Sequence, residues 1–594
     1  MCRQSRQNRS LPFALSALFA ALSVAFVAMP AFAQCGAPAD AIHDIQGRGE
    51  ASPLAGQQVT VEAILTRDAR GKGGFRGFYL QQADAETDRD PGTSEALFIY
   101  TPRTTGNPGQ RLRVTGTVKE FHGLTELVDV RAIEICGPGE LPDPIPVSLP
   151  WRQAPESLEN MRVTFTAPLT VVEHYQLAEF GELTLAATDQ VIPTEYLPPG
   201  HQAVEQAKQN RQHRVVLDDG KGMRNPDPVP WPPGGLSADN TIRAGDQVAG
   251  ITGVLDFRFG LWRVQPDRPP VFRERTDRPP APPRHEKADL RVVAFNLQNY
   301  FNGNGQGGGF PTERGAESPG EFERQSRQLV TTLHALNADL LALTELENDG
   351  HSETSALMQL TRQLGNPWQA VISRDHDGTD AIRTALLYRS DRVTPVGEAR
   401  RIRTGIYRSA GRPPLAQRFE VVGSGEAVQV VVPHMKSKSC RRASGANADR
   451  NDGQGCYSQR RLQEVQAMTE WLAQHGKSSN APERTVIAGD LNSYSRESPL
   501  QQFADAGYTS ALSHLYPCTA QSCPHHSYRY RGEKGALDHV LVSPDLLPRV
   551  VNASTWNVNA DEPRALAQQA LVPANQPWRA SDHNPVVVDL RLTP

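Results

Sequence analysis

The stretch VIAGDLNSY, residues 486–494, decides how the C-terminal part of this chain is interpreted. Its apolar start predicts a short buried strand that stops at a glycine. Asp490 and Asn492 follow two residues apart, and alternate side chains of an extended segment point the same way. A carboxylate and an amide therefore leave the strand end on one face, where open α/β sheets place their ligands. Because a glycine–aspartate pair after a strand is more often a turn, the rest of the chain must supply partners.

The first 33 residues have the composition of a secretory signal peptide. Arg3, Arg6 and Arg9 precede an apolar stretch, and Ala-Phe-Ala at 31–33 is a small-residue cleavage site. A membrane anchor is the alternative, but the cleavage site favours removal, and no other stretch approaches the roughly 20 apolar residues that a span needs. We expect a secreted protein, extracellular or periplasmic, that is monomeric and has no stable membrane insertion.

Cysteine usage agrees with export. Six cysteines remain once Cys2 leaves with the signal peptide, and an even number outside the cytosol favours disulfides. About 15 connectivities are open. We favour the pairs that each bracket one structural unit, which are Cys35–Cys136, Cys440–Cys456 and Cys518–Cys523. A zinc site made by the last pair with His525 and His526 is the alternative, but its spacing matches no common zinc pattern.

Overall composition does not indicate a nucleic-acid binder. The chain of 594 residues has 62 basic and 66 acidic residues, a net charge of −4, and loses three arginines with the signal peptide. Any binding to nucleic acid must therefore rest on local patches. The length predicts three or four domains, and 38% hydrophobic residues allow sizeable cores.

Residues 34–140 predict an all-β unit. Five short strands are expected, over residues 57–68, 78–82, 96–100, 112–118 and 127–135. Five such strands in about a hundred residues suit a small barrel such as the OB-fold. A basic, glycine-rich loop at 70–76 lies beside Phe78 and Tyr79. These residues either hold phosphates and stack bases, or form an ordinary hairpin loop with both rings in the core.

Two further sections precede a change in composition. Residues 141–275 form a second β-rich region without a catalytic constellation, and we expect a second barrel that packs against or orients its neighbours. Residues 276–287 form a proline-rich linker, which marks a domain boundary. Residues 288–594 then alternate buried strands with helices, which is an α/β pattern.

Two helices support the α/β interpretation. The first begins after Ser318 with a proline at its first position, and the second begins at Ser458 and is expected to stop near Gly476. Arg460 and Arg461 lie in the first turn of the second helix, where cations are unfavourable. They suggest an anionic partner, with a solvated face as the alternative.

Polar side chains lie at one end of each of six predicted strands in residues 288–594. Any one of them could be structural, but six in one domain are hard to dismiss. Acidic groups gathered at one edge repel each other unless a cation holds them. The residues are Asn296, Glu345, His434, Asp490 with Asn492, Asp538, and Asp582 with His583.

In this order the residues resemble the endonuclease/exonuclease/phosphatase superfamily, which includes deoxyribonuclease I and exonuclease III-type enzymes. The segments NLQNYF (296–301), ELEN (345–348) and HMKSK (434–438), behind an OB-like front end, resemble secreted bacterial extracellular nucleases. The resemblance implies a four-layer α/β sandwich of the deoxyribonuclease I type over residues 288–594. All-β OB-like barrel domains would precede it.

The resemblance also implies roles on the metal side of the site. Glu345 would be the principal Mg²⁺ ligand, with Mn²⁺ or Ca²⁺ as alternative ions. Asn296 would help to place the metal and the phosphate. Asp582 would complete the metal-side carboxylates. Arg383 sits where relatives have an arginine that contacts phosphate.

On the water side, Asp490 and Asn492 would hold or activate the attacking water, and Asp538 would orient His583. His434 matches a second histidine of the deoxyribonuclease I branch, but its carboxylate partner is not identifiable in the sequence. Whether Asp490 or His583 takes the proton of the water stays open, as does the number of metals.

A basic insertion over residues 436–461 favours nucleic acid as the substrate. The cations that we expect to bind substrate are Lys436, Lys438, Arg441 and Arg442. The prediction is a secreted, Mg²⁺-dependent, sequence-nonspecific endonuclease or exonuclease that cleaves DNA, with RNA as an alternative, to 5′-phosphate ends. The other hypotheses are a sphingomyelinase-like phosphodiesterase or phospholipase of the same fold, and an inactive nucleic-acid-binding or adhesion protein.

Overall fold

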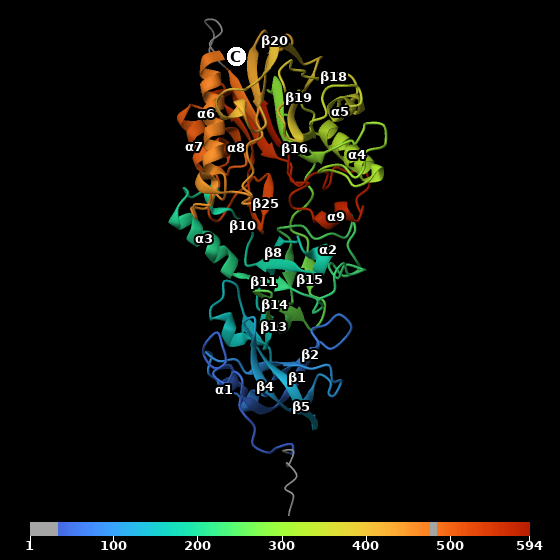
Figure 1. Cartoon of the computed structure of the whole chain (residues 1–594), viewed down its shortest axis with the longest axis vertical. Coiled ribbons are helices and arrows are strands. Elements are labelled where there is room, and N and C mark those ends of the chain that lie inside the picture. The colour runs from blue at the N-terminus through green and yellow to red at the C-terminus, as the bar shows by residue number, and fades with distance from the viewer. Residues whose placement is uncertain (1–33, 476–483, 594) are drawn as a thin grey trace, which may run out of the picture.

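The computed structural model describes residues 34–475 and 484–593. The predicted signal peptide and the predicted helix stop at Gly476 lie outside the described residues. Three sections follow one another along the long axis of the molecule (Figure 1). We call them the barrel (residues 58–138), the middle region (145–273) and the C-terminal region (288–593).

The barrel is a closed sheet with strand order β1-β2-β3-β5-β4. All five predicted strands are present. Their bounds are β1 (Gln58–Asp68), β2 (Gly77–Gln81), β3 (Ala96–Tyr100), β4 (Gln110–Phe121) and β5 (Leu124–Pro138). Apolar residues that alternate along each strand fill the interior, and helix α1 (Ile42–Gln46) adds two isoleucines to that core.

The hypothesis that Phe78 and Tyr79 stack bases is wrong, because both rings are fully buried. Phe78 points into the barrel core. Tyr79 points to the other face of β2, where it packs on Val254 of the middle region and donates its hydroxyl to Asp256 Oδ2 at 2.9 Å. The guanidinium of Arg70 is occupied as well, by Asp68 and by three backbone carbonyls.

The middle region is an open nine-stranded sheet, so the expectation of a second barrel is wrong. Its strand order is β15-β12-β8-β9-β11-β14-β13-β7-β6, with two edges that do not pair with each other. Strand residues such as Val171 form its core together with side chains from outside the sheet, such as Trp231 and Leu566. The strands are β6 (Ile145–Val147), β7 (Arg162–Phe165), β8 (Leu169–Glu173), β9 (Leu183–Ala186), β11 (Arg214–Leu217), β12 (Gln247–Ala249), β13 (Thr252–Arg258), β14 (Leu261–Pro266) and β15 (Val271–Arg273), and the helices are α2 (Leu177–Phe180) and α3 (His201–Gln212).

A small sheet joins the middle region to the C-terminal region. Strand β10 (Gln190–Val191) pairs in parallel with β26 (Glu533–Gly535), which pairs antiparallel with β25 (Tyr528–Tyr530). Helix α9 (Arg564–Gln568) of the C-terminal region packs its apolar residues into the core of the middle region, beside α2 (Figure 1). Backbone and core thus both cross this boundary.

The C-terminal region contains two six-stranded sheets that pack face to face. The first has the order β18-β19-β17-β16-β29-β28 and the second the order β20-β21-β22-β23-β27-β24. Alternate residues of the central strands, such as Val292 of the first sheet and Val430 of the second, form their shared core. The first sheet consists of β16 (Leu290–Tyr300), β17 (Leu340–Glu347), β18 (Trp368–Ala370), β19 (Ile382–Arg389), β28 (Val550–Thr555) and β29 (Val586–Leu590). The second consists of β20 (Val393–Arg401), β21 (Leu415–Val421), β22 (Ala427–Val432), β23 (Thr485–Asp490), β24 (Thr509–Ser510) and β27 (Asp538–Val542).

Helices cover the outer face of each sheet. Helices α4 (Pro319–Ala335) and α5 (Ala356–Leu364) pack on the first sheet, and α6 (Ser458–His475) and α7 (Ser498–Asp505) pack on the second, with α8 (Ala511–Leu515) nearby. The side chain of Ser318 caps α4 by accepting from the Glu321 amide, as its sequence indicated. The predicted α/β sandwich of four layers is therefore present (Figure 1).

The cysteine pairs follow the prediction. The three disulfides are Cys35–Cys136, Cys440–Cys456 and Cys518–Cys523, and the last bond favours the disulfide over the alternative zinc site, although His525 lies close to both sulfurs. Across residues 34–475 and 484–593, no helix combines the length and the apolar character needed to cross a membrane.

Candidate active site

The polar strand ends of the C-terminal region converge on one edge of the sandwich. Strands β23 and β27 run antiparallel in a register that sets Asp490 opposite Asp538. Strand β29 begins opposite the end of β16, which brings His583 toward Asn296. The six strands that the sequence singled out therefore present their polar ends to a common site.

Gly489 allows the second sheet to close at this edge. A Cβ atom on this residue would lie 2.2 Å from the Pro433 carbonyl oxygen, so no larger side chain fits. The close approach lets the chain after β22 form a bridge between His434 and Asp490. Gly489 is therefore required by packing, and not by a turn, since it lies within β23 and pairs with His539.

Asp490 is the centre of the cluster. Its Oδ2 accepts from Asn296 Nδ2 at 3.1 Å and lies 3.5 Å from His434 Nε2, while its Oδ1 accepts from the Asn492 amide at 2.8 Å. Ligand atoms of Glu345, His434 and Asp490 lie within 4.8 Å of one another, and so do those of Asp490, Asp538 and His583. Asp490 is the member that both groups share. Burial, and then the neighbouring Asp538 carboxylate, raise the pKa of Asp490 to about 7.

His583 forms a close pair with Asp538, as the resemblance implied. Its Nδ1 lies 2.6 Å from Asp538 Oδ2, and the ring is buried. Burial disfavours the charged ring, but the Asp538 carboxylate outweighs it and raises the pKa of His583 to about 10. The ring is therefore held positively charged at neutral pH. Tyr528 of β25 packs against it, with ring centroids 4.6 Å apart.

His434 has the opposite electrostatic character. Burial, and then the nearby Arg412 guanidinium, hold the pKa of His434 well below its ordinary value, so the ring is neutral. Its buried Nδ1 has no hydrogen-bond partner among the described residues. The carboxylate that faces it is Asp490, a partner that sequence spacing did not identify.

The backbone around Glu345 is strained. Glu345 has a φ of +63°, and Gln298 and Asn299 on the neighbouring strand each have a φ of +53°. Both strands carry a bulge here, between Asn296 and Tyr300 and between Leu343 and Leu346. Bulges and left-handed residues of this kind re-aim side chains and cluster at functional sites. Here they let the Asn299 amide donate to Glu345 Oε2 at 3.0 Å.

The acidic residues fit a divalent cation. Burial, and then the Asp582 carboxylate, raise the pKa of Glu345, although His583, Asn296 and Arg412 partly oppose the shift. Carboxylate and amide oxygens from Glu345, Asp490 and Asn296 are the donors that hard cations prefer. Asp582 stays outside both close groups, on the side that faces the middle region.

The predicted substrate-binding cations divide into two sets. Arg441 and Arg442 are exposed on the loop closed by Cys440–Cys456. Lys436 is half-buried, with its Nζ 4.7 Å from the centre of the Tyr457 ring.

The other set is buried and engaged within the protein. Lys438 Nζ donates to Glu497 Oε2 at 2.6 Å, and burial lowers the pKa of Lys438 to about 8. Arg383 is 1% exposed and lies 2.9 Å from Asp377. Substrate contact by Lys438 and Arg383 stays a prediction, and these internal partners do not favour it.

The suggested anionic partners of the α6 arginines are internal. Arg461 is fully buried and donates to Ser493 Oγ and to three backbone carbonyls. Arg460 pairs with Glu464 one turn further along the same helix at 3.0 Å. Neither arginine forms part of a free basic face.

Two residues near the site were missed from the sequence. Arg412 donates to the His434 and Met435 carbonyls and so fixes the loop that carries His434. Tyr528 supports the His583 ring. Neither residue lies at a predicted strand end, which is the pattern that identified the other site residues. For Tyr528, the sequence signal was its position ten residues before Asp538.

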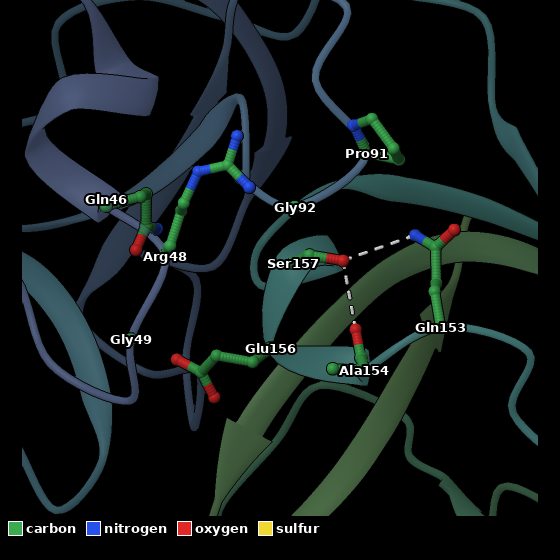
Figure 2. A pocket seen from close by; sticks show the side chains of 10 residues that line it. Gln46, Arg48, Gly49, Pro91, Gly92, Gln153, Ala154, Glu156 and Ser157 are labelled. Atoms are coloured by element: carbon green, nitrogen blue, oxygen red, sulfur yellow. Dashed lines mark hydrogen bonds between the residues drawn. The ribbon is translucent and has the colours of Figure 1, made fainter.

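A cavity of about 240 Å³ lies between residues 46–49 and 91–92 on one side and residues 153–157 of the middle region on the other (Figure 2). Arg48 and Glu156 line it, and Ser157 accepts from Gln153 and donates to the Ala154 carbonyl. None of the polar strand-end residues lines this cavity, so it is not the place where the chemistry occurs.

Comparisons with known proteins agree with this geometry. Residues 293–583 match the model of the Endonuclease/Exonuclease/phosphatase family, and residues 154–275 match a Domain of unknown function (DUF8508). No curated protein sequence matches the chain. Many solved structures do. The catalytic domain of human Nocturnin with bound sulfate is 18% identical, with a TM-score of 0.33, over 51% of this chain and 94% of that one. A mannosyl-6-phosphatase from Bacteroides thetaiotaomicron is 16% identical (TM-score 0.33, 51% and 99%), and an AP endonuclease from Leishmania major is 15% identical (TM-score 0.34, 51% and 88%).

Proposed function

The chain belongs, through residues 293–583, to the endonuclease/exonuclease/phosphatase family, and from that premise we propose that it is a secreted, metal-dependent, sequence-nonspecific nuclease. It hydrolyses phosphodiester bonds of DNA, with RNA as an alternative substrate, and leaves 5′-phosphate ends. Members of this family are hydrolases of the nuclease or phosphatase type.

The observation that carries the proposal is the position of Asp490 between two chemically different groups. On one side it meets Glu345 and His434, and on the other Asp538 and His583. Phosphodiester hydrolysis needs an acceptor for the proton of water and positive charge for the phosphoryl oxygens. Asp490 can accept the proton of water, and the charged His583 ring beside it can stabilise the phosphoryl oxygens, so one site provides both functions.

His583 and Asp490 have different protonation states, which gives them different roles in the proposed reaction. His583 holds its proton through Asp538, so it acts as a charged hydrogen-bond donor to a phosphoryl oxygen and not as the base. Asp490, with its pKa raised to about 7, accepts the proton of the attacking water. Asn492, whose Nδ2 is tied to the Met435 carbonyl at 3.1 Å, holds the backbone that orients Asp490.

Glu345 and Asn296 would hold the metal, with Asp582 completing the carboxylates on that side. Mg²⁺ is our first choice because the donors are oxygens, and Mn²⁺ or Ca²⁺ are the alternatives. When bound, the cation supplies Lewis acidity and neutralises charge on the phosphate. The raised pKa of Glu345 is compatible with this assignment, because burial and the Asp582 carboxylate disfavour its charged form and a bound cation would favour it.

Nucleic acid is the proposed substrate because free cations flank the site. Arg441 and Arg442 are exposed on a loop that follows His434, and Lys436 lies at its base. Contacts from such residues to backbone phosphates provide affinity without reading sequence.

We also propose how the chain divides into domains. Residues 1–33 are the signal peptide, 34–140 an OB-like barrel, 141–275 a second β-rich domain, 276–287 a linker and 288–594 the catalytic domain. The strand order β1-β2-β3-β5-β4 supports the OB-like assignment, and the three disulfides are compatible with an extracellular or periplasmic location.

The test is incubation of the full mature chain with circular and linear DNA, with Mg²⁺ or with excess EDTA. We expect Mg²⁺-dependent nicking of the circle and no cleavage in EDTA. Asp490→Asn should lower kcat by about 10²–10⁴-fold, the usual value of a general base, with an unchanged circular dichroism spectrum.

Asp505→Asn is the matched control, since this carboxylate is exposed on α7 and only bonds Gln501 on its own helix. Full activity in EDTA would exclude a role of a divalent metal in cleavage. Cleavage of sphingomyelin vesicles but not of DNA would instead support the lipid phosphodiesterase, and inactivity on both substrates the binding protein.

A further inference from the structure

A second cavity lies directly beside the proposed catalytic site. It has a volume of about 260 Å³ and opens between the middle region and the C-terminal region. The end of β8 and the turn after it form one wall, and β25, α9 and the segment before His583 form the other. We call it the joint cavity.

The joint cavity borders the proposed catalytic cluster. Asp582, the residue before His583, lines it. Tyr528 lines it as well and packs on the His583 ring. Gln298, two residues after Asn296, forms part of the same wall. A group that occupies this cavity is therefore a direct neighbour of a phosphate bound at the site.

The side chains of the cavity combine an aromatic face with cations. Tyr175, in the turn after β8, is 54% exposed, and the Arg564 guanidinium lies 4.2 Å from the centre of its ring. Arg579 donates to the Asn559 carbonyl at 3.1 Å. Within the part of the chain that the structure describes, neither arginine forms an ion pair with a carboxylate.

Other ionisable side chains that line the cavity have ion-pair partners or shifted pKa values. Arg529 is bound by Asp189 and Asp561. Burial raises the pKa of Glu173, which favours its neutral form, and lowers the pKa of His174 to about 4, so that ring is neutral. The cations left for a ligand are Arg564 and Arg579, in a cavity that the carboxyl groups of Asp582 and Glu173 also line.

We propose that the joint cavity is a subsite for the nucleotide next to the scissile phosphate of a single strand. The base stacks on the open face of Tyr175, and Arg564 with Arg579 holds its phosphate. Aromatic stacking accepts any base, and arginine suits phosphate because of its fork of donors. This inference rests on the proposed nuclease function.

The size of the cavity determines the form of the substrate. Drug-sized ligands occupy roughly 300–1,000 Å³, so a cavity at or below this range holds one base and not a stacked duplex. The base must leave its stack, which costs least in single strands and at frayed ends. Tyr175 lies within residues 154–275, so the middle region takes part in substrate choice.

The experiment uses the full mature chain, Mg²⁺ and single-stranded oligonucleotides in which one nucleotide is replaced by an abasic unit. We expect the wild type to cut the bond beside the abasic unit about tenfold more slowly than the same bond beside a base, the size of one lost stacking contact. Tyr175→Ala should be about tenfold slower at intact bonds and should no longer distinguish the abasic unit.

Tyr175→Phe keeps the ring and should retain the discrimination, and Tyr516→Ala, an exposed tyrosine that does not line the cavity, should behave as the wild type. Arg564→Gln is a second probe and should raise KM and weaken its salt dependence. Equal cutting beside bases and abasic units by an active wild type would overturn the subsite and leave the nuclease assignment intact. Absence of cleavage of every oligonucleotide by the wild type would overturn the nuclease assignment itself.

Discussion

The middle region is joined to its two neighbours in different ways. Toward the barrel, no strands pair among the described residues, and the contacts are side-chain bonds, such as that from Tyr79 to Asp256, with one backbone bond from the Gly222 amide to the Gly73 carbonyl. Toward the C-terminal region, the backbone itself crosses, because β10 extends the sheet of β25 and β26. The first joint fixes the position of the barrel, and the second supplies part of the framework of the site.

The second joint leads directly to the catalytic pair. Glu195 of the middle region accepts from the Ala536 amide at 2.6 Å, two residues before Asp538. Ile192 packs on Leu537 and Tyr494, beside the Tyr528 ring that supports His583. Damage at this joint should therefore reach catalysis, whereas equal damage at the barrel joint should not.

The largest effect is expected from a matched pair of arginine substitutions. Arg529→Met removes the guanidinium that Asp189 and Asp561 share at the second joint and leaves them with Lys534 and His526, and Arg258→Met removes the ion-pair partner of Asp256 at the barrel joint. Each should lower the free energy of unfolding by about 3–5 kcal/mol, because a buried carboxylate loses its partner. Urea unfolding measures this loss.

The activity of the same two variants tests whether only the second joint supports catalysis. Under conditions where both are folded, kcat should fall for Arg529→Met alone, since β25 carries Tyr528 against His583. An equal fall in kcat for folded Arg258→Met would contradict the distinction between the joints.

A smaller effect concerns pH. Burial raises the pKa of Glu195 from 4.5 to about 7. Because the folded state holds the proton more tightly, the stability that this group contributes is complete below about pH 4.5 and is lost as pH rises through about 7. The loss should reach up to about 3 kcal/mol, at about 1.4 kcal/mol for each pKa unit.

Urea midpoints between pH 4.5 and 8 test this expectation. Glu195→Gln should remove most of the decline. Glu156, at the barrel joint, also has a pKa raised to about 7 by burial, but it is only partly buried beside the cavity of Figure 2. Glu156→Gln should therefore flatten the profile less, because solvent screens its charge, and the reverse order would contradict the assignment.

The smallest effect comes from single hydroxyl groups. Tyr79→Phe removes the bond to Asp256, and Thr194→Val removes a 3.0 Å bond to Glu497 at the second joint. Each should cost about 1–3 kcal/mol, the usual value for a hydrogen bond to a charged group. Thermal unfolding measures the cost, and only Thr194→Val should also reduce kcat. Loss of activity in Tyr79→Phe would show that the barrel joint is coupled to the site.

The catalytic cluster could be predicted from sequence because each of its parts is local. Asp490 ends a short apolar run, and His583 precedes another. An apolar strand with a polar end is visible along the chain, and the order of six such ends indicated the family. The pairing of Asp538 with His583 came from the resemblance, and the 2.6 Å contact agrees with it.

Predictions from the sequence were wrong where distant parts of the chain form the environment of a residue. The alternation along β2 is visible, but not that the middle region covers its outer face and buries Tyr79. Arg461 has the sequence of a free cation, yet loops from outside its helix surround it with carbonyls. The two-residue strand β10 has no periodicity that could be recognised.

By itself, the sequence indicated the strands of the barrel, two helices and six strands of the sandwich, the favoured cysteine pairs and the polar residues at the strand ends, because these depend on periodicity and spacing over a few residues. Tertiary structure alone decided that Asp490 is shared by both groups, that His434 is neutral while His583 is charged, and that Tyr175 lies beside Asp582. The physical reason is that burial and electrostatic environment depend on the segments that fold against a residue, which spacing along the chain does not record.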